Sequence, residues 1–178
     1  MKIPKNLPNA LTVLRIFMVG IFVWLFRAGH TYWSLFVFLL AGLTDILDGW
    51  LSRKFDLVSD FGKLMDPLAD KLMTVALIAC FYLKGYIDIV ILIILAVKEL
   101  LMIIGALVML KKNVVVKSNI FGKLATFLTI AALTLTFFHE HIYPWDTIVL
   151  YVATAVSLFA MVMYFREYYM QKSGRENA

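Results

Sequence analysis

The sequence predicts an all-α membrane protein, a bundle of six transmembrane helices that forms a single domain, 1–178. Hydrophobic residues make up 62% of the chain and its mean hydropathy is +0.86, whereas soluble domains are about 45–50% apolar. The apolar residues fall into six runs, and each run approaches the roughly 20 residues that a transmembrane helix needs. Six such helices with short connections use nearly all of these residues, so we expect one polytopic domain.

The six runs are expected to form helices in chain order. The first run follows Lys2 and Lys5 and resembles a signal peptide, but no small-residue cleavage site follows it, so we expect a retained helix. Short connections make successive helices antiparallel neighbours. The predicted spans are 10–28, 32–52, 62–83, 87–110, 121–139 and 146–165.

The distribution of basic residues predicts the orientation of the bundle. The net charge is +5, and a basic excess suits either nucleic acid or an anionic membrane surface. The basic residues lie at the ends of the apolar runs, which favours membrane lipids and argues against nucleic acid. Most of them lie on the side of both termini and the 53–63 connection, whereas Arg27 and Lys84 lie on the other side. The positive-inside rule therefore predicts that both termini are cytoplasmic in a multi-pass cell-membrane protein.

Polar residues at the end of the second span and the start of the third interrupt this apolar pattern. The residues of the second span that share one helix face are Asp45, Asp48, Gly49, Ser52 and Arg53. Those of the third span that share one face are Gly62, Asp66 and Asp70. If the two helices are antiparallel neighbours, four carboxylates converge just inside the cytoplasmic face. Solvated interfacial charges would explain one or two aspartates, but intramembrane carboxylates are costly and usually functional.

Four converging carboxylates predict a site for divalent cations. Like charges repel strongly in a low dielectric and recruit cations. Oxygen ligands favour Mg²⁺ or Mn²⁺, and the single cysteine, Cys80, excludes a multi-cysteine metal site. Two such ions about 3.5–4 Å apart are suited to in-line phosphoryl substitution. Gly49 and Gly62 would let a phosphate approach the backbone, and Arg53 suits a diphosphate.

The spacing of these residues resembles the signature of the CDP-alcohol phosphatidyltransferases, D-x2-D-G-x2-A-R-x8-G-x3-D-x3-D. The chain matches every invariant position from Asp45 to Asp70 except Ser52, where the family usually has alanine. Serine is nearly as small, so the helix contact should survive. The family's six-helix bundle agrees with the predicted spans, and the resemblance covers essentially the whole chain. It implies an enzyme that transfers a phosphatidyl group from CDP-diacylglycerol to an alcohol and releases CMP.

Other residues resemble one branch of the family, the phosphatidylglycerophosphate synthases and the CMP-forming cardiolipin synthases. The run LPNALTVLR, which ends at Arg15, is similar to the opening of both. The resemblance favours sn-glycerol 3-phosphate as the acceptor, with phosphatidylglycerol as the alternative. These synthases usually carry Arg-Glu in the fourth span, where this chain has Lys98-Glu99. Lysine keeps the charge but loses the bidentate fork, so the acceptor stays open.

The resemblance also implies a role for each site residue. Asp45, Asp48 and Asp66 are expected to bind the metals, and Asp70 is expected to be both a ligand and the base that accepts the acceptor's hydroxyl proton. The residues expected at the CDP-lipid are Gly49, Ser52, Arg53, Gly62, Asn9 and Thr12. Asn9 could instead cap a helix, and Thr12 could instead pack between helices.

A basic pocket is expected to hold the phosphate of a phosphorylated small alcohol. Lys123 is its main candidate, helped by Lys98 and Arg166. Each of these side chains could instead extend to the membrane interface, and Lys98 could pair with Glu99. Because family members are often dimeric, the resemblance also allows a homodimer.

Two other classes of protein fit the sequence less well than an enzyme does. A cation transporter would need acidic residues along both halves of a pathway, but the acids cluster at one face with Arg53 among them. A non-catalytic scaffold gives no reason for the spacing of the aspartates and glycines. His139 and His141 lie on the opposite side from the aspartates, where we expect a solvated loop rather than a metal site.

Overall fold

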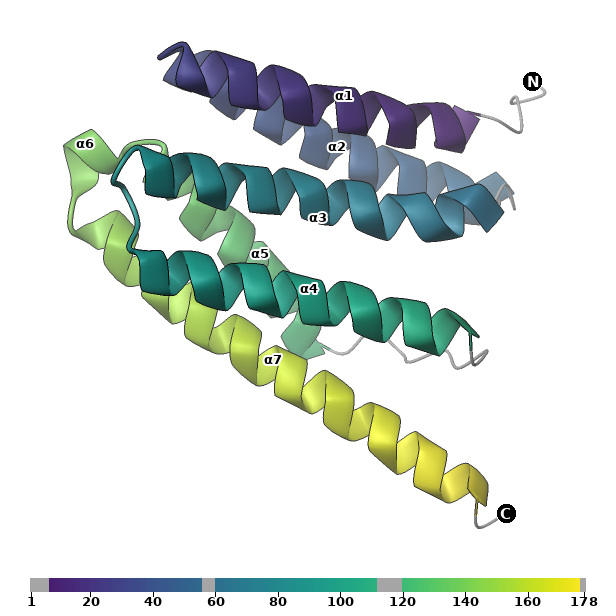
Figure 1. Cartoon of the computed structure of the whole chain (residues 1–178). Helices are drawn as coiled ribbons and strands as arrows, with labels where there is room; N and C mark the ends of the chain where they lie inside the picture. The colour runs from purple at the N-terminus through teal and green to yellow at the C-terminus, as the bar shows by residue number, and fades with distance from the viewer. Residues whose placement is uncertain (1–6, 56–59, 112–119, 177–178) are drawn as a thin grey trace. The chain divides into compact units, whose positions relative to one another are not determined.

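The computed structural model describes residues 7–55, 60–111 and 120–176 (Figure 1). Within these ranges the chain is helical and contains no strand, so the all-α prediction is confirmed. The helices are α1 (Leu7–Arg27), α2 (Thr31–Phe55), α3 (Asp60–Leu83), α4 (Ile89–Lys111), α5 (Ile120–Thr136), α6 (His139–Ile142) and α7 (Trp145–Glu176). They group into two compact units, Met1–Leu83 with α1 to α3 and Lys84–Ala178 with α4 to α7.

Each predicted span coincides with one long helix, and the largest difference in a boundary is at the end of α7. Helix α7 continues past residue 165 to Glu176, because the polar residues that end the apolar run are still good helix formers. Helix α5 ends at Thr136, and a single turn, α6, forms between α5 and α7. The apolar pattern marks where lipid contact can end, and a helix need not end at the same residue.

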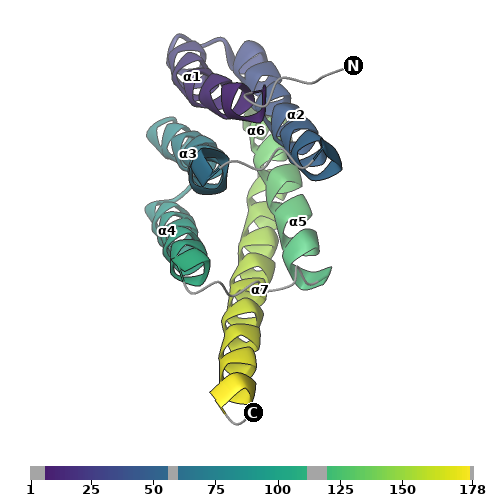
Figure 2. The same cartoon turned by 90° about the vertical axis from the view of Figure 1, so that its right-hand side faces the viewer.

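In the first unit, α1 packs against both α2 and α3 (Figures 1 and 2). Met18, Phe22 and Phe26 are buried along one face of α1, at the four-residue spacing of a helical stripe. The ring of Phe26 meets the ring of Phe81 in α3 edge-on, with 5.6 Å between the centroids. This apolar stripe joins the three helices of the unit.

A glycine turn makes α1 and α2 antiparallel neighbours, as the sequence predicts. Gly29 has a φ of 83°, a left-handed conformation that glycine adopts without strain. The Gly29 amide donates to the Phe26 carbonyl, and the His30 amide donates to the Leu25 carbonyl. These two bonds satisfy the last carbonyls of α1 in a Schellman motif. The reversal brings the start of α1 beside the end of α2.

In the second unit, α5 and α7 pack through small side chains. The small buried residues of the two helices are Ala125, Thr129, Ala132, Thr136, Ala153, Thr154, Ser157 and Ala160. Small residues let transmembrane helices approach closely. The hydroxyl of Thr136 donates to the Ala132 carbonyl at 3.0 Å, and that of Thr154 donates to the Leu150 carbonyl at 2.7 Å. The hydroxyls of Thr136 and Thr154 are therefore satisfied within their own helices.

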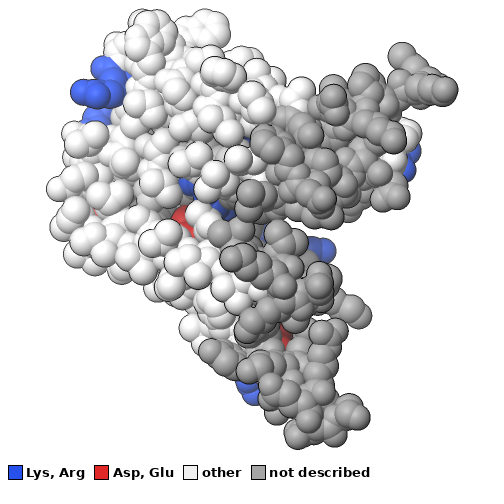
Figure 3. Space-filling view, turned by 45° about the vertical axis from the view of Figure 1, so that its right-hand side comes forward, with Lys and Arg blue, Asp and Glu red and all other residues white. Residues whose placement is uncertain are grey.

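The outer surfaces of both units are apolar. Trp24, Phe127 and Phe159 are among many large apolar side chains that are exposed, and the described surface in Figure 3 is mostly neither acidic nor basic. Among the described residues, Ala10–Arg27 and Trp145–Glu167 are long and apolar enough to cross a membrane, and shorter apolar helices accompany them. Exposed apolar area of this extent marks a surface that contacts lipid or protein, so the structure supports membrane association. Six spans remain a prediction.

Candidate active site

The predicted aspartates lie on two helices of the first unit. Asp45 and Asp48 belong to the C-terminal half of α2, and Asp66 and Asp70 belong to the N-terminal half of α3. Only residues 56–59 separate the two helices along the chain, so both pairs lie near the same end of the unit (Figure 1). Several predicted site residues of this unit lie outside the set whose side chains the structure describes. They are Asn9, Asp48, Ser52, Arg53, Gly62, Asp66 and Asp70. The convergence of four carboxylates therefore stays a prediction.

Of the four aspartates in the motif, Asp45 is the one whose side chain the structure describes, and it is paired with a buried arginine of α1. Arg15 Nη1 lies 2.8 Å from Asp45 Oδ1, and the exposed fractions of the two side chains are 2% and 45%. Thr12, three residues before Arg15 on the same face of α1, is also fully buried. Both residues continue the stripe that contains Met18. The buried face of α1 thus changes from apolar to polar where it reaches Asp45.

The aspartate motif gives no role to Arg15, although the position of this charged residue in the sequence indicates one. Arg15 lies inside the first apolar run, and a charged residue within a transmembrane segment is rare and usually functional. Thr12 was expected either at the CDP-lipid or in helix packing. Its complete burial agrees with packing, and contact with the lipid substrate stays a prediction. Gly49 follows Asp48 on α2 and is partly buried.

The chemistry of the donor set fits hard divalent cations. Asp45 offers carboxylate oxygens from a side chain that is nearly half exposed, and carboxylate oxygen is the ligand type that Mg²⁺ and Mn²⁺ prefer. Among the side chains that the structure describes, no three His, Cys, Asp or Glu residues gather as a metal site. The three other aspartates of the motif lie outside that set.

The residues predicted to hold the acceptor's phosphate all belong to the second unit. Lys98 Nζ lies 2.5 Å from Glu99 Oε1 on α4, and the Glu99 side chain is only 3% exposed. The pairing with Glu99 that the sequence left open is thus present. Lys123 on α5 and Arg166 on α7 are exposed. The basic pocket itself stays a prediction.

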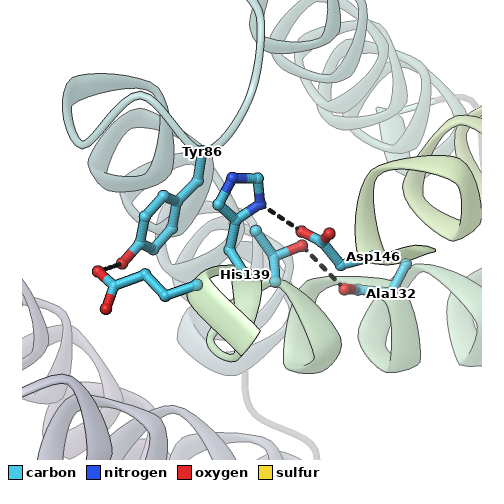
Figure 4. Close-up of polar contacts among 6 residues, drawn as sticks. Tyr86, Ala132, His139 and Asp146 are labelled. Atoms are coloured by element: carbon cyan, nitrogen blue, oxygen red, sulfur yellow. Dashed lines mark hydrogen bonds and ion pairs between the residues drawn. The ribbon is translucent and has the colours of Figure 1, made fainter. Parts of the chain in front are cut away.

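A polar cluster lies where α4, α6 and α7 begin (Figure 4). His139 Nδ1 lies 2.7 Å from Asp146 Oδ2, and the Asp146 side chain is 1% exposed. The ring of Tyr86 stacks on His139 with 4.6 Å between centroids, and its hydroxyl donates to Glu140 Oε1 at 2.5 Å. Lys84 Nζ lies 3.4 Å from the same Glu140 oxygen.

This cluster corrects the expectation of a solvated loop around the two histidines. His139 belongs to α6 and is mostly buried by its contacts with Asp146 and Tyr86, whereas His141 is exposed. Tyr86 lies far from His139 in sequence, whereas Asp146 lies seven residues after it; the apolar pattern indicated neither contact. A solvated loop is wrong for His139 because three separate segments meet around its ring.

Comparisons with known proteins agree with the motif. Residues 5–165, which contain the aspartate motif and reach both units, match the family described as CDP-alcohol phosphatidyltransferase. A CDP-diacylglycerol–glycerol-3-phosphate 3-phosphatidyltransferase of Rickettsia prowazekii is 37% identical over 139 residues, 76% of each chain. A protein of the same name from Bacillus subtilis is 31% identical over 150 residues, 76% of this chain and 78% of that protein. A cardiolipin synthase (CMP-forming)/mitochondrial hydrolase fusion protein of Schizosaccharomyces pombe is 39% identical over 79 residues, 44% of this chain and 13% of that protein. The aspartate motif and the family match together establish that this chain belongs to the CDP-alcohol phosphatidyltransferase family.

Proposed function

We propose that the chain transfers a phosphatidyl group from CDP-diacylglycerol to sn-glycerol 3-phosphate, with release of CMP. The observation that carries this proposal is the family match over 5–165, which includes every aspartate of the motif. The names of the relatives from Rickettsia prowazekii and Bacillus subtilis specify glycerol 3-phosphate. The product would be phosphatidylglycerophosphate, a precursor for phospholipid synthesis.

We infer that the six long helices cross the cell membrane and form one catalytic domain, 1–178. The exposed apolar side chains of both units support lipid contact, and the family match includes residues of both units. The basic residues near both termini support a cytoplasmic location for the aspartates through the positive-inside rule. CDP-diacylglycerol would keep its acyl chains in the bilayer and its nucleotide in the polar site. A homodimer is proposed from the family resemblance alone.

In the proposed reaction two divalent cations, Mg²⁺ or Mn²⁺, would be held by Asp45, Asp48, Asp66 and Asp70. When bound, these ions supply positive charge against the diphosphate of the CDP-lipid. Gly49 and Gly62 leave space for the phosphates at the backbone, and Arg53 supplies a fixed positive charge. Asn9 and Thr12 are proposed to contact the nucleotide, and Ser52 to preserve the close helix contact.

Asp70 is proposed to accept the proton of the acceptor hydroxyl. The hydroxyl oxygen attacks the phosphorus atom that bears the diacylglycerol, and a new P–O bond forms. The bond from that phosphorus to the oxygen that bridges the diphosphate breaks, and CMP leaves with the electron pair. General-base assistance of this kind contributes about 10²–10⁴ in rate.

The acceptor's phosphate is proposed to bind near Lys123, with Lys98 and Arg166 nearby. Glu99 would fix the ammonium group of Lys98, since the two groups are 2.5 Å apart. Phosphatidylglycerol is the second candidate acceptor, because the fusion protein of Schizosaccharomyces pombe carries the name of a cardiolipin synthase. A cation transporter is disfavoured because the acidic motif lies at one end of α2 and α3 rather than along a pathway.

An assay of CMP release identifies the reaction and the acceptor together. The purified full chain, in lipid nanodiscs with Mg²⁺ or Mn²⁺, is given CDP-diacylglycerol and one acceptor from a panel that includes glycerol 3-phosphate, phosphatidylglycerol, serine and inositol. We expect CMP only with glycerol 3-phosphate, and a rate of release from the Asp70→Asn variant that is about 10²–10⁴ lower. Release with phosphatidylglycerol alone would assign cardiolipin synthesis, and no release with any acceptor would overturn the proposal.

A further inference from the structure

We infer that the outer face of α2 carries a binding site for an anionic phospholipid, formed by Trp50, Lys54 and Phe55 near the end of the helix. The ligand is the phosphate group of a bilayer lipid with a net negative charge, bound outside the active site. The inference rests on the membrane crossing of α2, which is part of the proposed function. The observations behind it are an exposed apolar stripe on α2 and the position of Lys54 at the end of that stripe.

The two faces of α2 differ in what covers them. Along one face the buried residues recur at steps of three and four: Ser34, Phe38, Ala41 and Thr44. On the opposite face a second series recurs at alternating steps of four and three, and all of its side chains are exposed: Tyr32, Phe36, Leu39, Leu43, Ile46 and Trp50. We call this series the outer stripe of α2. In the proposed topology it is the part of α2 that meets lipid.

The length of the outer stripe matches the hydrocarbon core of a bilayer. Tyr32 and Trp50 are its first and last residues, separated by about 27 Å at the rise of an α-helix. The hydrocarbon core is about 30 Å thick. Both side chains combine an apolar ring with a hydrogen-bond donor, and such side chains favour the two membrane interfaces. We therefore expect the indole ring of Trp50 at the level where the lipid headgroups begin.

Lys54 extends the outer stripe towards the lipid phosphates. It follows Trp50 by one helical turn, and its ammonium group lies 4.4 Å from the centroid of the Trp50 ring and 5.7 Å from that of Phe55. All three side chains are exposed, and the two rings meet edge-on at 6.5 Å between centroids. No carboxylate of the described residues pairs with Lys54. Because one lysine near a membrane surface favours anionic lipid by about fivefold, this charge selects a lipid with a net negative charge.

The lipid site is separate from the aspartate motif. Lys54 follows Asp45 by about two and a half helical turns, so the two side chains leave opposite sides of α2. A lipid bound at Lys54 therefore need not compete with CDP-diacylglycerol. It would instead fix the depth at which the end of α2, with Asp45 and Asp48, lies in the membrane.

The test measures which lipid lies beside Trp50 in nanodiscs. The full chain with Trp24→Phe, Trp33→Phe and Trp145→Phe keeps Trp50 as its one tryptophan, and all three replaced side chains are exposed. Lipids brominated on the acyl chain quench its fluorescence in proportion to their local concentration. The two probes are brominated phosphatidylserine and brominated phosphatidylcholine at the same low mole fraction. Phosphatidylserine is anionic and is neither substrate nor product of the proposed reaction.

We expect Trp50 to prefer phosphatidylserine by about fivefold. Lys54→Gln should abolish this preference, whereas Lys54→Arg, which keeps the charge, should retain it. Arg27→Gln is the matched control and should also retain it, since Arg27 is an exposed base before the opposite end of α2. Thermal unfolding checks that each variant is folded.

Equal quenching by both lipids, or a preference that Lys54→Gln retains, would overturn the inference. If neither lipid quenches Trp50, another protein surface such as a second copy of the chain covers the outer stripe, and the inference is wrong. CMP release by the same chain is measured separately. A lipid preference without CMP release would reject the proposed function and leave the lipid site standing, whereas CMP release without a lipid preference would reject the lipid site alone.

Discussion

Asp70 combines two roles in the proposed mechanism, and one substitution separates them. Asp66 and Asp70 are one helical turn apart on α3, so they share a face and can share a metal. Asp70→Asn keeps the size and one oxygen but cannot accept a proton. We expect kcat to fall by about 10²–10⁴, with a much smaller change in affinity for CDP-diacylglycerol, measured by steady-state kinetics. Asp45→Asn should instead weaken metal and nucleotide binding. Near-normal kcat in Asp70→Asn would mean that another group is the base.

Lys123 tests the acceptor pocket in the same assay. It is exposed on α5, and its ammonium group would pair with the phosphate of glycerol 3-phosphate. Lys123→Ala should raise the KM for glycerol 3-phosphate more than the KM for CDP-diacylglycerol, whereas Arg27→Ala should change neither. A change confined to the KM for CDP-diacylglycerol would show that the pocket lies elsewhere.

At the scale of elements, the start of α7 is joined to α6 by a buried carboxylate. Asp146→Ala leaves His139 without the partner that lies 2.7 Å away. Loss of a hydrogen bond to a charged group costs about 1.5–3 kcal/mol, so we expect a lower thermal unfolding temperature. Asp88→Ala removes a contact with the exposed hydroxyl of Tyr151 and should cost less. His139→Ala also removes the stacking on Tyr86, so the double variant should be less stable than Asp146→Ala, but by less than the sum of the two single effects. Fully additive effects would contradict the pairing.

The same cluster predicts how unfolding depends on pH. The hydrogen bond from Tyr86 and the charge of Lys84 lower the pKa of Glu140. The stability that Glu140 contributes is therefore present above the ordinary glutamate pKa of about 4.3 and is lost as pH falls through the lowered value. Burial and the bond to Glu140 raise the pKa of Tyr86, so its contribution is present below about pH 10 and is lost as pH rises further.

The unfolding temperature measured as a function of pH tests both the loss of stability in acid and the loss in alkali. Glu140→Gln should lose stability relative to the parent between pH 5 and pH 9, and the difference should shrink in acid. Tyr86→Phe should remove the alkaline loss. Parallel curves for the parent and Glu140→Gln across the acid range would contradict the assigned ionisation.

The elements differ in how well the sequence indicated them. Apolar runs of about 20 residues predicted α1 to α5 and α7, because lipid contact requires such runs. The turn α6 and the extension of α7 were missed, since neither depends on apolar periodicity. For the site, spacing on α2 and α3 indicated the aspartates, whereas the contact of Arg15 with Asp45 joins residues 30 positions apart. Such a pair follows from helix register, which a single sequence does not contain.

For the whole molecule, the charge asymmetry predicts which connections face the cytoplasm. Reporter fusions at 84–86 and at 111–117 should report opposite sides of the membrane. The fusion at 111–117 should be cytoplasmic, because that connection contains Lys111, Lys112 and Lys117. Fusions after the C-terminus should agree with the second. Matching locations for the two internal fusions would contradict the six-span topology.

The ion pair between α1 and α2 also bears on how the chain enters the membrane during synthesis. Helix α1 leaves the ribosome first and carries Arg15 within its apolar run, while the counter-charge arrives later on α2. A lone arginine disfavours insertion by up to about 2.5–3.5 kcal/mol at the centre of a span, although less near its end. In the proposed six-span topology, insertion of α1 and α2 together, as a hairpin closed at Gly29, would avoid that penalty. The ion pair would then couple the membrane insertion of these two helices.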